Sequence, residues 1–161
     1  MAVLGPAGAG AMSIVREAGQ APLVIAYADE SGRAQRLEPD GSALTVLHFW
    51  ASWCIPCLKE LPVLDAMADE WKGKGVRVIA LSMDGDDMDT AAQFFKDRGI
   101  RNLTLNIDSN NEAMRLLHVH ALPATIFLNA GGEEVARADG PVKWREEAAR
   151  AFIAPYLRTA R

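Results

Sequence analysis

Runs of consecutive hydrophobic residues alternate along this chain with segments in which hydrophobic residues recur at helical spacing. The run at 43–50 is apolar and β-branched, broken only by His48, and is typical of a central strand covered on both faces. Further strands are expected at 23–27, 34–37, 76–82, 103–107, 124–128 and 134–138. The second of these should pair back on the first as a small hairpin, and the last on the one before it.

Helical spacing marks four longer segments and one short segment. Helices are expected at 54–71, 87–98, 110–118 and 142–157, with a short helix around 13–18. In the last long helix, Trp144, Ala148, Ala151 and Phe152 are expected on one face, and Pro155 is expected to bend or end it. The alternation of strands and helices predicts an α/β domain with a mostly parallel sheet and a terminal antiparallel hairpin.

Composition narrows the class of protein. The length of 161 residues, half of them hydrophobic, fits one compact domain. We expect a flexible segment or short helix at 1–20 and the folded domain at 21–161. The formal net charge of −4, with acids and bases spread along the chain, argues against nucleic-acid binding, which needs clustered positive charge.

The chain shows no sequence signal for a membrane or a secretory pathway. It has no apolar stretch of about 20 residues that would span a bilayer. The first 12 residues carry no Lys or Arg and so lack the charged start of a secretory signal. The protein is therefore expected either to be cytosolic or to begin after a removed signal or anchor.

The only two cysteines, Cys54 and Cys57, lie three positions apart. A disulfide framework for a small secreted fold would use more cysteines at wider spacings. A structural zinc site needs four ligands, and a c-type haem site would need a histidine where Leu58 stands. We expect no metal and no cofactor, although half of a metal site or a simply buried pair stays an alternative.

The spacing of the two cysteines points to redox chemistry. On a helix that begins at Cys54, residues three apart lie on one face, so the sulfurs can form a disulfide. The unpaired N–H groups and dipole at the helix start stabilise a thiolate there. Cys54 is expected to be the exposed nucleophile and Cys57 to resolve the mixed disulfide. Pro56 fits the first helical turn, where a missing N–H costs nothing, and Trp53 and Pro56 are expected to contact substrate.

The segment Phe49–Cys57 resembles the active-site segment of the thioredoxin superfamily. Pro62 lies where thioredoxins have a helix proline, and Leu122-Pro123 resembles their cis-proline loop. Trp-Cys-x-Pro-Cys followed by Lys59–Pro62 is most similar to the TlpA/ResA-like group of bacterial extracytoplasmic thiol–disulfide oxidoreductases. The resemblance implies a thioredoxin-like α/β fold, with a central mixed sheet flanked by helices and an N-terminal β-hairpin extension.

The resemblance also implies roles for residues outside the cysteine pair. Pro123 should be cis and face the cysteines, with Leu122 offering backbone groups to a substrate strand, unless it is an ordinary trans proline. Glu60 matches an acidic residue that the group uses as a proton acceptor or pKa tuner, the alternative being a solvated helix glutamate. His48 stands where thioredoxin has a buried Asp. It could relay the proton of Cys57, or be a neutral, hydrogen-bonded core residue.

One acidic segment is not among the motifs that carry the resemblance. Met83–Asp89 follows a predicted strand and is interpreted as a turn with acidic residues at a helix start, where the dipole favours them. We expect this loop at the same sheet edge as Cys54, where it could also touch a partner.

The sequence is compatible with three functions. The first is a reductase of protein disulfides, and the second is a dithiol oxidase. Pro56 favours the reductase, because strong oxidants of the superfamily carry His at that position. The third is a copper-binding assembly factor on a thioredoxin scaffold.

By resemblance, the expected clients are extracytoplasmic proteins such as those of cytochrome or oxidase assembly, with a membrane-bound thiol electron donor. The expected location is the bacterial periplasm or extracytoplasmic face. A monomer is expected, anchored to a membrane only through a segment outside this chain.

Overall fold

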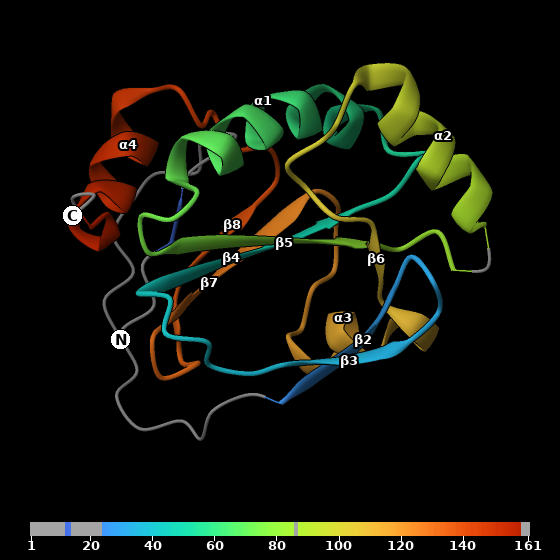
Figure 1. Ribbon diagram of the computed structural model, residues 1–161, viewed down its shortest axis with the longest axis horizontal. Coiled ribbons are helices and arrows are strands. Elements are labelled where there is room, and N and C mark those ends of the chain that lie inside the picture. The colour runs from blue at the N-terminus through green and yellow to red at the C-terminus, as the bar shows by residue number, and fades with distance from the viewer. Residues whose placement is uncertain (1–11, 14–23, 86, 159–161) are drawn as a thin grey trace.

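The computed structural model describes residues 12–13, 24–85 and 87–158 (Figure 1). Its strands are β1 (Met12–Ser13), β2 (Ile25–Asp29), β3 (Ala34–Leu37), β4 (Leu44–Trp50), β5 (Val76–Ser82), β6 (Asn106–Ile107), β7 (Ala124–Asn129) and β8 (Glu134–Asp139). Its helices are α1 (Ile55–Trp71), α2 (Met88–Arg98), α3 (Glu112–Leu116) and α4 (Glu147–Ile153), with 3₁₀ turns η1 (Ser109–Asn111) and η2 (Ala154–Tyr156). Ser13 belongs to a strand, not to the short helix expected around 13–18. The rest of that helix, and most of the expected segment 1–20, lie outside the described residues.

The strands of the described residues form one mixed sheet of eight strands in the order β1-β8-β7-β4-β5-β6-β2-β3. The fold class inferred from the resemblance is confirmed, including the β2–β3 hairpin, in which Ile25 pairs with Leu37. The expectation of a mostly parallel sheet was wrong: only β4–β5 and β5–β6 are parallel among the pairs described. The segment that joins β6 to β7 carries α3 and returns to the end of the sheet where β4 ends, so Ala124 at the start of β7 pairs with Phe49, and β7 runs antiparallel to β4.

Strand β4 is buried along its whole length because both faces of the sheet are covered. Leu44, Val46 and Trp50 pack in one apolar cluster with residues of α1, α2 and α4, whereas Leu47 and Phe49 pack in a second cluster with residues of α3. Figure 1 shows α1, α2 and α4 on one face of the sheet and α3 on the other. Since successive side chains of a strand alternate, His48 faces the same side as Val46 and Trp50, toward α1.

The C-terminal helix is shorter than expected. Helix α4 begins at Glu147, and Ala148 and Ala151 are exposed, so the expected apolar face at 142–157 was wrong. The buried positions are Ala149 and Ile153. The preceding loop stays out of the helix because its groups have partners elsewhere: the ring of Trp144 packs 5.9 Å from that of Trp71, centroid to centroid, and the N–H of Val142 donates to a side chain of α1.

Strand β6 is also shorter than expected, because only Asn106 and Ile107 of the segment 103–107 pair in the sheet. Asp65 of α1 takes the backbone N–H of Leu103 at 2.9 Å and that of Asn102 at 2.7 Å. Backbone groups engaged by a carboxylate are not available to a strand partner. Among the described residues, no helix has both the length and the apolar character needed to cross a membrane.

Candidate active site

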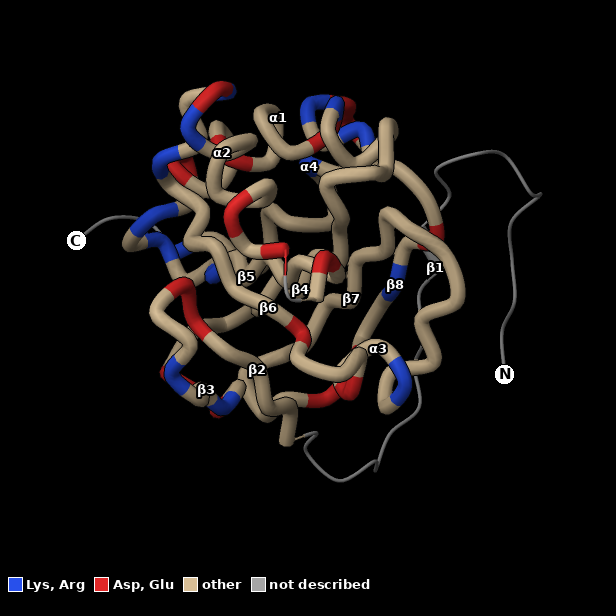
Figure 2. The backbone as a smooth tube through the Cα atoms, turned by 90° about the vertical axis from the view of Figure 1, so that its right-hand side faces the viewer, with Lys and Arg blue, Asp and Glu red and all other residues tan. Residues whose placement is uncertain are grey.

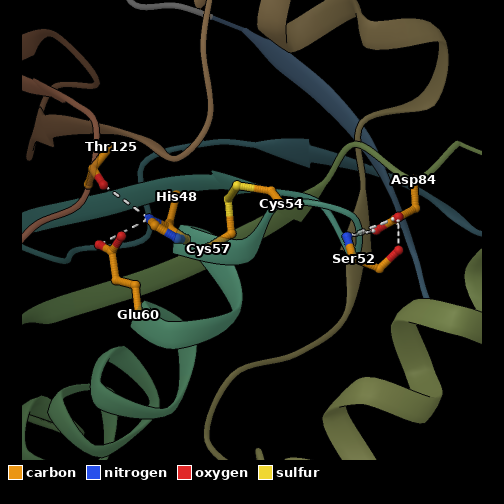
Figure 3. Close-up of a disulfide and its surroundings, with 7 residues drawn as sticks. All are labelled: His48, Ser52, Cys54, Cys57, Glu60, Asp84 and Thr125. Carbon is orange, nitrogen blue, oxygen red and sulfur yellow. Dashed lines mark hydrogen bonds and ion pairs between the residues drawn. A yellow bond between two sulfur atoms is a disulfide. The ribbon is translucent and has the colours of Figure 1, made fainter.

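The two cysteines lie where β4 passes into α1. Cys54 is the N-cap residue of α1 with an extended backbone, and Cys57 lies in the first turn, on the buried face of the helix. Their Cα atoms are 5.3 Å apart, and the two sulfurs form a disulfide (Figure 3). Cys57 has no exposed surface and Cys54 retains 6%. Cys54 is thus the more accessible of the two, but in this disulfide form it is far less exposed than the sequence led us to expect.

The start of α1 offers donors to a sulfur at Cys54. The backbone N–H of Cys54 donates to the carbonyl of Ala51 at 3.1 Å, and the carbonyl of Cys54 accepts from Leu58 N–H at 3.1 Å. An N-cap side chain accepts the N–H of the second or third helical residue, here Pro56 or Cys57. Because Pro56 has no N–H, only the N–H of Cys57 is available to the Cys54 sulfur. This N–H and the dipole of a 17-residue helix both favour a thiolate at Cys54 once the disulfide is reduced.

A carboxylate fixes the loop that carries Cys54. Asp84 accepts the backbone N–H of Ser52 at 3.0 Å through either oxygen, and it also accepts the Ser52 hydroxyl (Figure 3). It accepts the hydroxyl of Ser82 as well, at 2.6 Å. The acidic segment lies at the sheet edge where it was expected, but this role of Asp84 was not predicted. The parallel pairing of β4 with β5 was the usable signal, because the residues that follow two adjacent parallel strands lie together.

His48 lies in the buried core beneath the cysteines. Its Nδ1 is 3.0 Å from the hydroxyl oxygen of Thr125 on β7, and its Nε2 has no partner among the described residues. Burial lowers the pKa of His48 to about 3, so the ring is neutral at physiological pH. In the close-up its ring points toward the turn of α1 that carries Cys57 (Figure 3).

Glu60 is buried as well, one turn further along α1. Its Oε1 accepts the indole N–H of Trp144 at 2.7 Å and the backbone N–H of Val142 at 3.2 Å, and its Oε2 has no partner among the described residues. Burial raises the pKa of Glu60 to about 7, although these two hydrogen bonds oppose the shift. The alternative of a solvated helix glutamate is therefore wrong.

Glu60 and His48 face each other across the core. Glu60 Oε1 lies 3.9 Å from His48 Nδ1 (Figure 3). Because the histidine is neutral at physiological pH, the two do not form an ion pair there. The arrangement brings one weak acid that titrates near neutral pH next to one neutral imidazole, and each keeps an unpaired polar atom, which is uncommon in a folded core.

The expected substrate-binding residues lie at the same edge of the sheet. The Leu122–Pro123 peptide bond is cis, and Pro123 precedes Ala124, which pairs with Phe49 near the end of β4. Pro56 is exposed, and Trp53 is 71% exposed beside Cys54. Leu122 is partly buried and makes no backbone hydrogen bond within the described part of the chain. Its N–H and carbonyl remain available to another strand.

A metal site requires several ligand side chains in one place. Within residues 12–13, 24–85 and 87–158, no three or more His, Cys, Asp or Glu side chains come together in a way that could hold a metal ion.

Comparison with known proteins gives a consistent picture. The model of the family described as AhpC/TSA matches residues 20–135. The chain is 36% identical over 90 residues to the thiol-disulfide oxidoreductase ResA of Oceanobacillus iheyensis, covering 55% of this chain and 45% of that protein. It is 29% identical over 117 residues to the sporulation thiol-disulfide oxidoreductase A of Bacillus subtilis, covering 68% and 70%. The chain spans about half the length of the first of these relatives.

Solved structures share the fold. A structure attributed to the thiol:disulfide interchange protein DsbE of Chlorobium tepidum superposes with a TM-score of 0.74 and 25% identity, over 86% of this chain and 96% of that chain. StoA of Bacillus subtilis superposes with a TM-score of 0.64 and 28% identity, over 75% and 90%.

Proposed function

Since this chain belongs to the AhpC/TSA family of thioredoxin-like proteins, we propose that it is a thiol–disulfide oxidoreductase that acts through Cys54 and Cys57. The observation that carries the proposal is the disulfide at the first turn of α1, with Cys54 as the N-cap residue and Cys57 fully buried behind it. The relatives' names support it, since they describe thiol–disulfide oxidoreductases.

The proposed reaction balances in two steps. The Cys54 thiolate attacks one sulfur of a substrate disulfide, forming a mixed disulfide and releasing the other substrate sulfur as a thiolate. Cys57 then attacks the Cys54 sulfur, which forms the Cys54–Cys57 disulfide and releases the second substrate thiolate. Two electrons pass to the substrate, whose two thiolates take up protons. A donor dithiol must then reduce the pair.

Glu60 and His48 are proposed to handle the proton that Cys57 must lose in the second step. A base with a pKa near the ambient pH serves this purpose best, and the pKa of Glu60 is about 7. His48 cannot hold a proton for long, because burial lowers its pKa to about 3. The neutral ring can pass a proton on, because Nε2 can receive a proton while Nδ1 releases another toward Glu60. Glu60 Oε1 lies 3.9 Å from Nδ1 and would have to move closer.

We propose that the substrate strand lies across the sheet edge formed by Trp53, Pro56, Leu122 and Pro123. An exposed indole supplies apolar contact, and the backbone groups of Leu122 can pair with an extended segment. A strand bound there would bring its disulfide to Cys54.

The finer assignment is a reductase of extracytoplasmic protein disulfides, for example in cytochrome or oxidase assembly, that works as a monomer with a membrane-bound thiol donor. Pro56 before the second cysteine supports the reducing direction over an oxidase. A bacterial periplasmic or extracytoplasmic location is proposed from the resemblance of the active-site segment to the TlpA/ResA-like group. No observation favours the copper-binding alternative: among the described residues, the cysteines belong to no group of three or more His, Cys, Asp or Glu side chains that could hold a metal ion.

The test is turnover and trapping with single cysteine variants. Cys54→Ser should abolish catalysis of the reduction of insulin disulfides by dithiothreitol, leaving the uncatalysed rate. Cys57→Ser should accumulate a stable mixed disulfide with substrate, because the resolving thiol is missing. Trapping through Cys57 in the Cys54→Ser variant would reverse the two roles. Stoichiometric copper binding by the reduced protein, without any dithiol turnover, would contradict the proposed oxidoreductase activity.

A further inference from the structure

A cavity of about 460 Å³ lies far from the cysteines. Residues 40–42, which precede β4, form one side, and the turn from the end of α1 into β5 forms another. Arg101 and Asn102, which follow α2, and Arg158, which follows η2, complete the wall. Four segments that are distant in sequence therefore meet at this cavity.

Three of these four segments bring positive charge to the cavity. The cationic side chains are those of Lys72, Arg77, Arg101 and Arg158, and the only acid in the lining is Asp40. This excess of three positive charges stands out in a chain whose formal net charge is −4. Figure 2 shows Lys and Arg segments gathering on the side of the molecule where the chain ends.

Two of the cations are held in place by the fold. Arg77 pairs with Asp40 at 3.0 Å and donates to the hydroxyl of Thr45, also at 3.0 Å. Arg158 donates to the carbonyl of Gly41 at 2.7 Å through its guanidinium, and to the carbonyl of Lys74 at 2.7 Å through its backbone N–H. The cavity wall is therefore built by specific contacts.

The other two cations have no such partner. Neither Lys72 nor Arg101 forms an ion pair within the described residues. Both follow helix C-termini, and the dipoles of α1 and α2 explain a basic residue there. That explanation does not extend to Arg77 on strand β5 or to Arg158 beyond η2. Lys72, Arg101 and Arg158 line this open cavity and are exposed to solvent. A bound anion would relieve the repulsion between their like charges.

The cavity lies at the opposite end of the sheet from the redox pair. Residues 40–42 and the α1–β5 turn precede β4 and β5, whereas Cys54 follows β4. Seven residues of strand at about 3.3 Å each separate the two ends by roughly 20 Å. A ligand in this cavity would leave the cysteines open to substrate.

We propose that this cavity binds a phosphate group of an anionic ligand, with Lys72 and Arg101 as the charges that the ligand neutralises. Guanidinium groups match the geometry of phosphate oxygens, and a dianion complements an excess of three charges better than a monoanion does. A free phosphate compound and the headgroup of an acidic phospholipid share this chemistry. A bilayer bound at this end would hold the redox pair away from its surface.

The experiment is an NMR titration with inorganic phosphate at constant ionic strength, with acetate as the reference anion. Amide signals of residues 72–77 and 101–102 should shift saturably with phosphate and much less with acetate. Lys72→Gln/Arg101→Gln should weaken phosphate binding at least tenfold. Lys143→Gln/Arg145→Gln removes the same charges from the loop before α4, at the other end of the sheet, and should leave binding unchanged.

A second arm separates the two sources of phosphate. The protein is sedimented with phosphatidylglycerol vesicles and with phosphatidylcholine vesicles. If the protein binds phosphatidylglycerol vesicles but not phosphatidylcholine vesicles, and Lys72→Gln/Arg101→Gln loses this binding, the ligand is a lipid headgroup. If the protein binds inorganic phosphate saturably but binds neither kind of vesicle, the ligand is a soluble phosphate compound. The proposal is overturned by the absence of both, or by equal binding in the two double variants. Neither readout depends on turnover, so the redox function and this site can fail separately.

Discussion

At the scale of single residues, the site combines two buried groups whose pKa values shift in opposite ways. Burial raises the pKa of Glu60 from 4.5 to about 7 and lowers that of His48 from 6.5 to about 3, because in each case the charged form is disfavoured. Both groups are consequently neutral across a window between about pH 3 and 7. Their effects on stability have opposite signs, so each must be isolated by a variant.

Glu60→Gln should change how stability depends on pH. The folded state holds the Glu60 proton up to about pH 7, whereas the unfolded chain releases it near 4.5. Stability is therefore lost as pH rises through this range. From pH 5 to pH 8 the oxidised wild type should lose about 2–3 kcal/mol of unfolding free energy relative to Glu60→Gln. Urea unfolding of both proteins at the two pH values measures this.

His48 contributes in the other direction, since its depressed pKa costs stability as pH falls from 6.5 toward 3. The wild type alone can thus appear nearly insensitive to pH. For this reason the comparison uses the difference between wild type and Glu60→Gln, in which the His48 contribution cancels. A difference that stays constant from pH 5 to pH 8 would show that Glu60 titrates normally.

His48→Asn should slow resolution of the mixed disulfide without preventing its formation. Asparagine can keep a hydrogen bond to Thr125 but cannot pass a proton as imidazole does. The release of the second substrate thiol should become at least about 100-fold slower, the lower end of general-base effects, while release of the first is unchanged. Acid-quenched single-turnover reactions of the reduced protein with a model disulfide resolve the two releases. Equal rates of the second release would remove His48 from the proton path.

At the scale of elements, the site depends on the contact between two loops that follow adjacent parallel strands. Asp84 after β5 holds Ser52 after β4, and the N–H of Met83 donates to the carbonyl of Trp50 at 2.8 Å. These bonds fix the loop that enters α1, and hence the position of Cys54 at the helix start. None of them involves a sulfur atom.

The pattern of apolar positions was enough to place these elements, because β4 is a long continuous apolar run and α1 is a long segment with helical spacing. Each begins one residue later than the sequence predicted, at Leu44 and Ile55. The pattern failed where long-range polar contacts decide the structure. The N–H of Leu103 donates to Asp65 and therefore does not pair with a neighbouring strand. Contacts of Trp144 with Trp71 keep the loop before α4 from joining that helix.

The same limit applies to the site. The cysteine spacing points to the redox pair by itself, since both residues lie in one helical turn. The burial of Glu60 does not follow from its helix, because its hydrogen-bond donors, Val142 and Trp144, lie more than 80 positions along the chain. Only the assembled fold shows that this carboxyl group faces His48.

At the scale of the whole molecule, the redox pair is attached to the most deeply buried part of the sheet. Strand β4 is buried at all seven positions and is bonded to β5 on one side and β7 on the other. The hairpin strand β3 lies at the sheet edge and pairs only with β2 in the described part of the chain. Structural openings should therefore be least frequent in β4 and more frequent in β3.

This architecture predicts how far a change of redox state spreads. The bonds that hold residues 51–53 and the start of α1 do not use the sulfurs, so reduction should leave the sheet as it is. In native-state hydrogen exchange, amides of β4 should exchange only by global unfolding in both redox states. Amides of residues 52–57 should exchange faster after reduction with dithiothreitol, because the cross-link over the first turn is gone. Faster exchange of β7 or α4, at unchanged global stability, would mean that the disulfide also holds the distant parts of the fold.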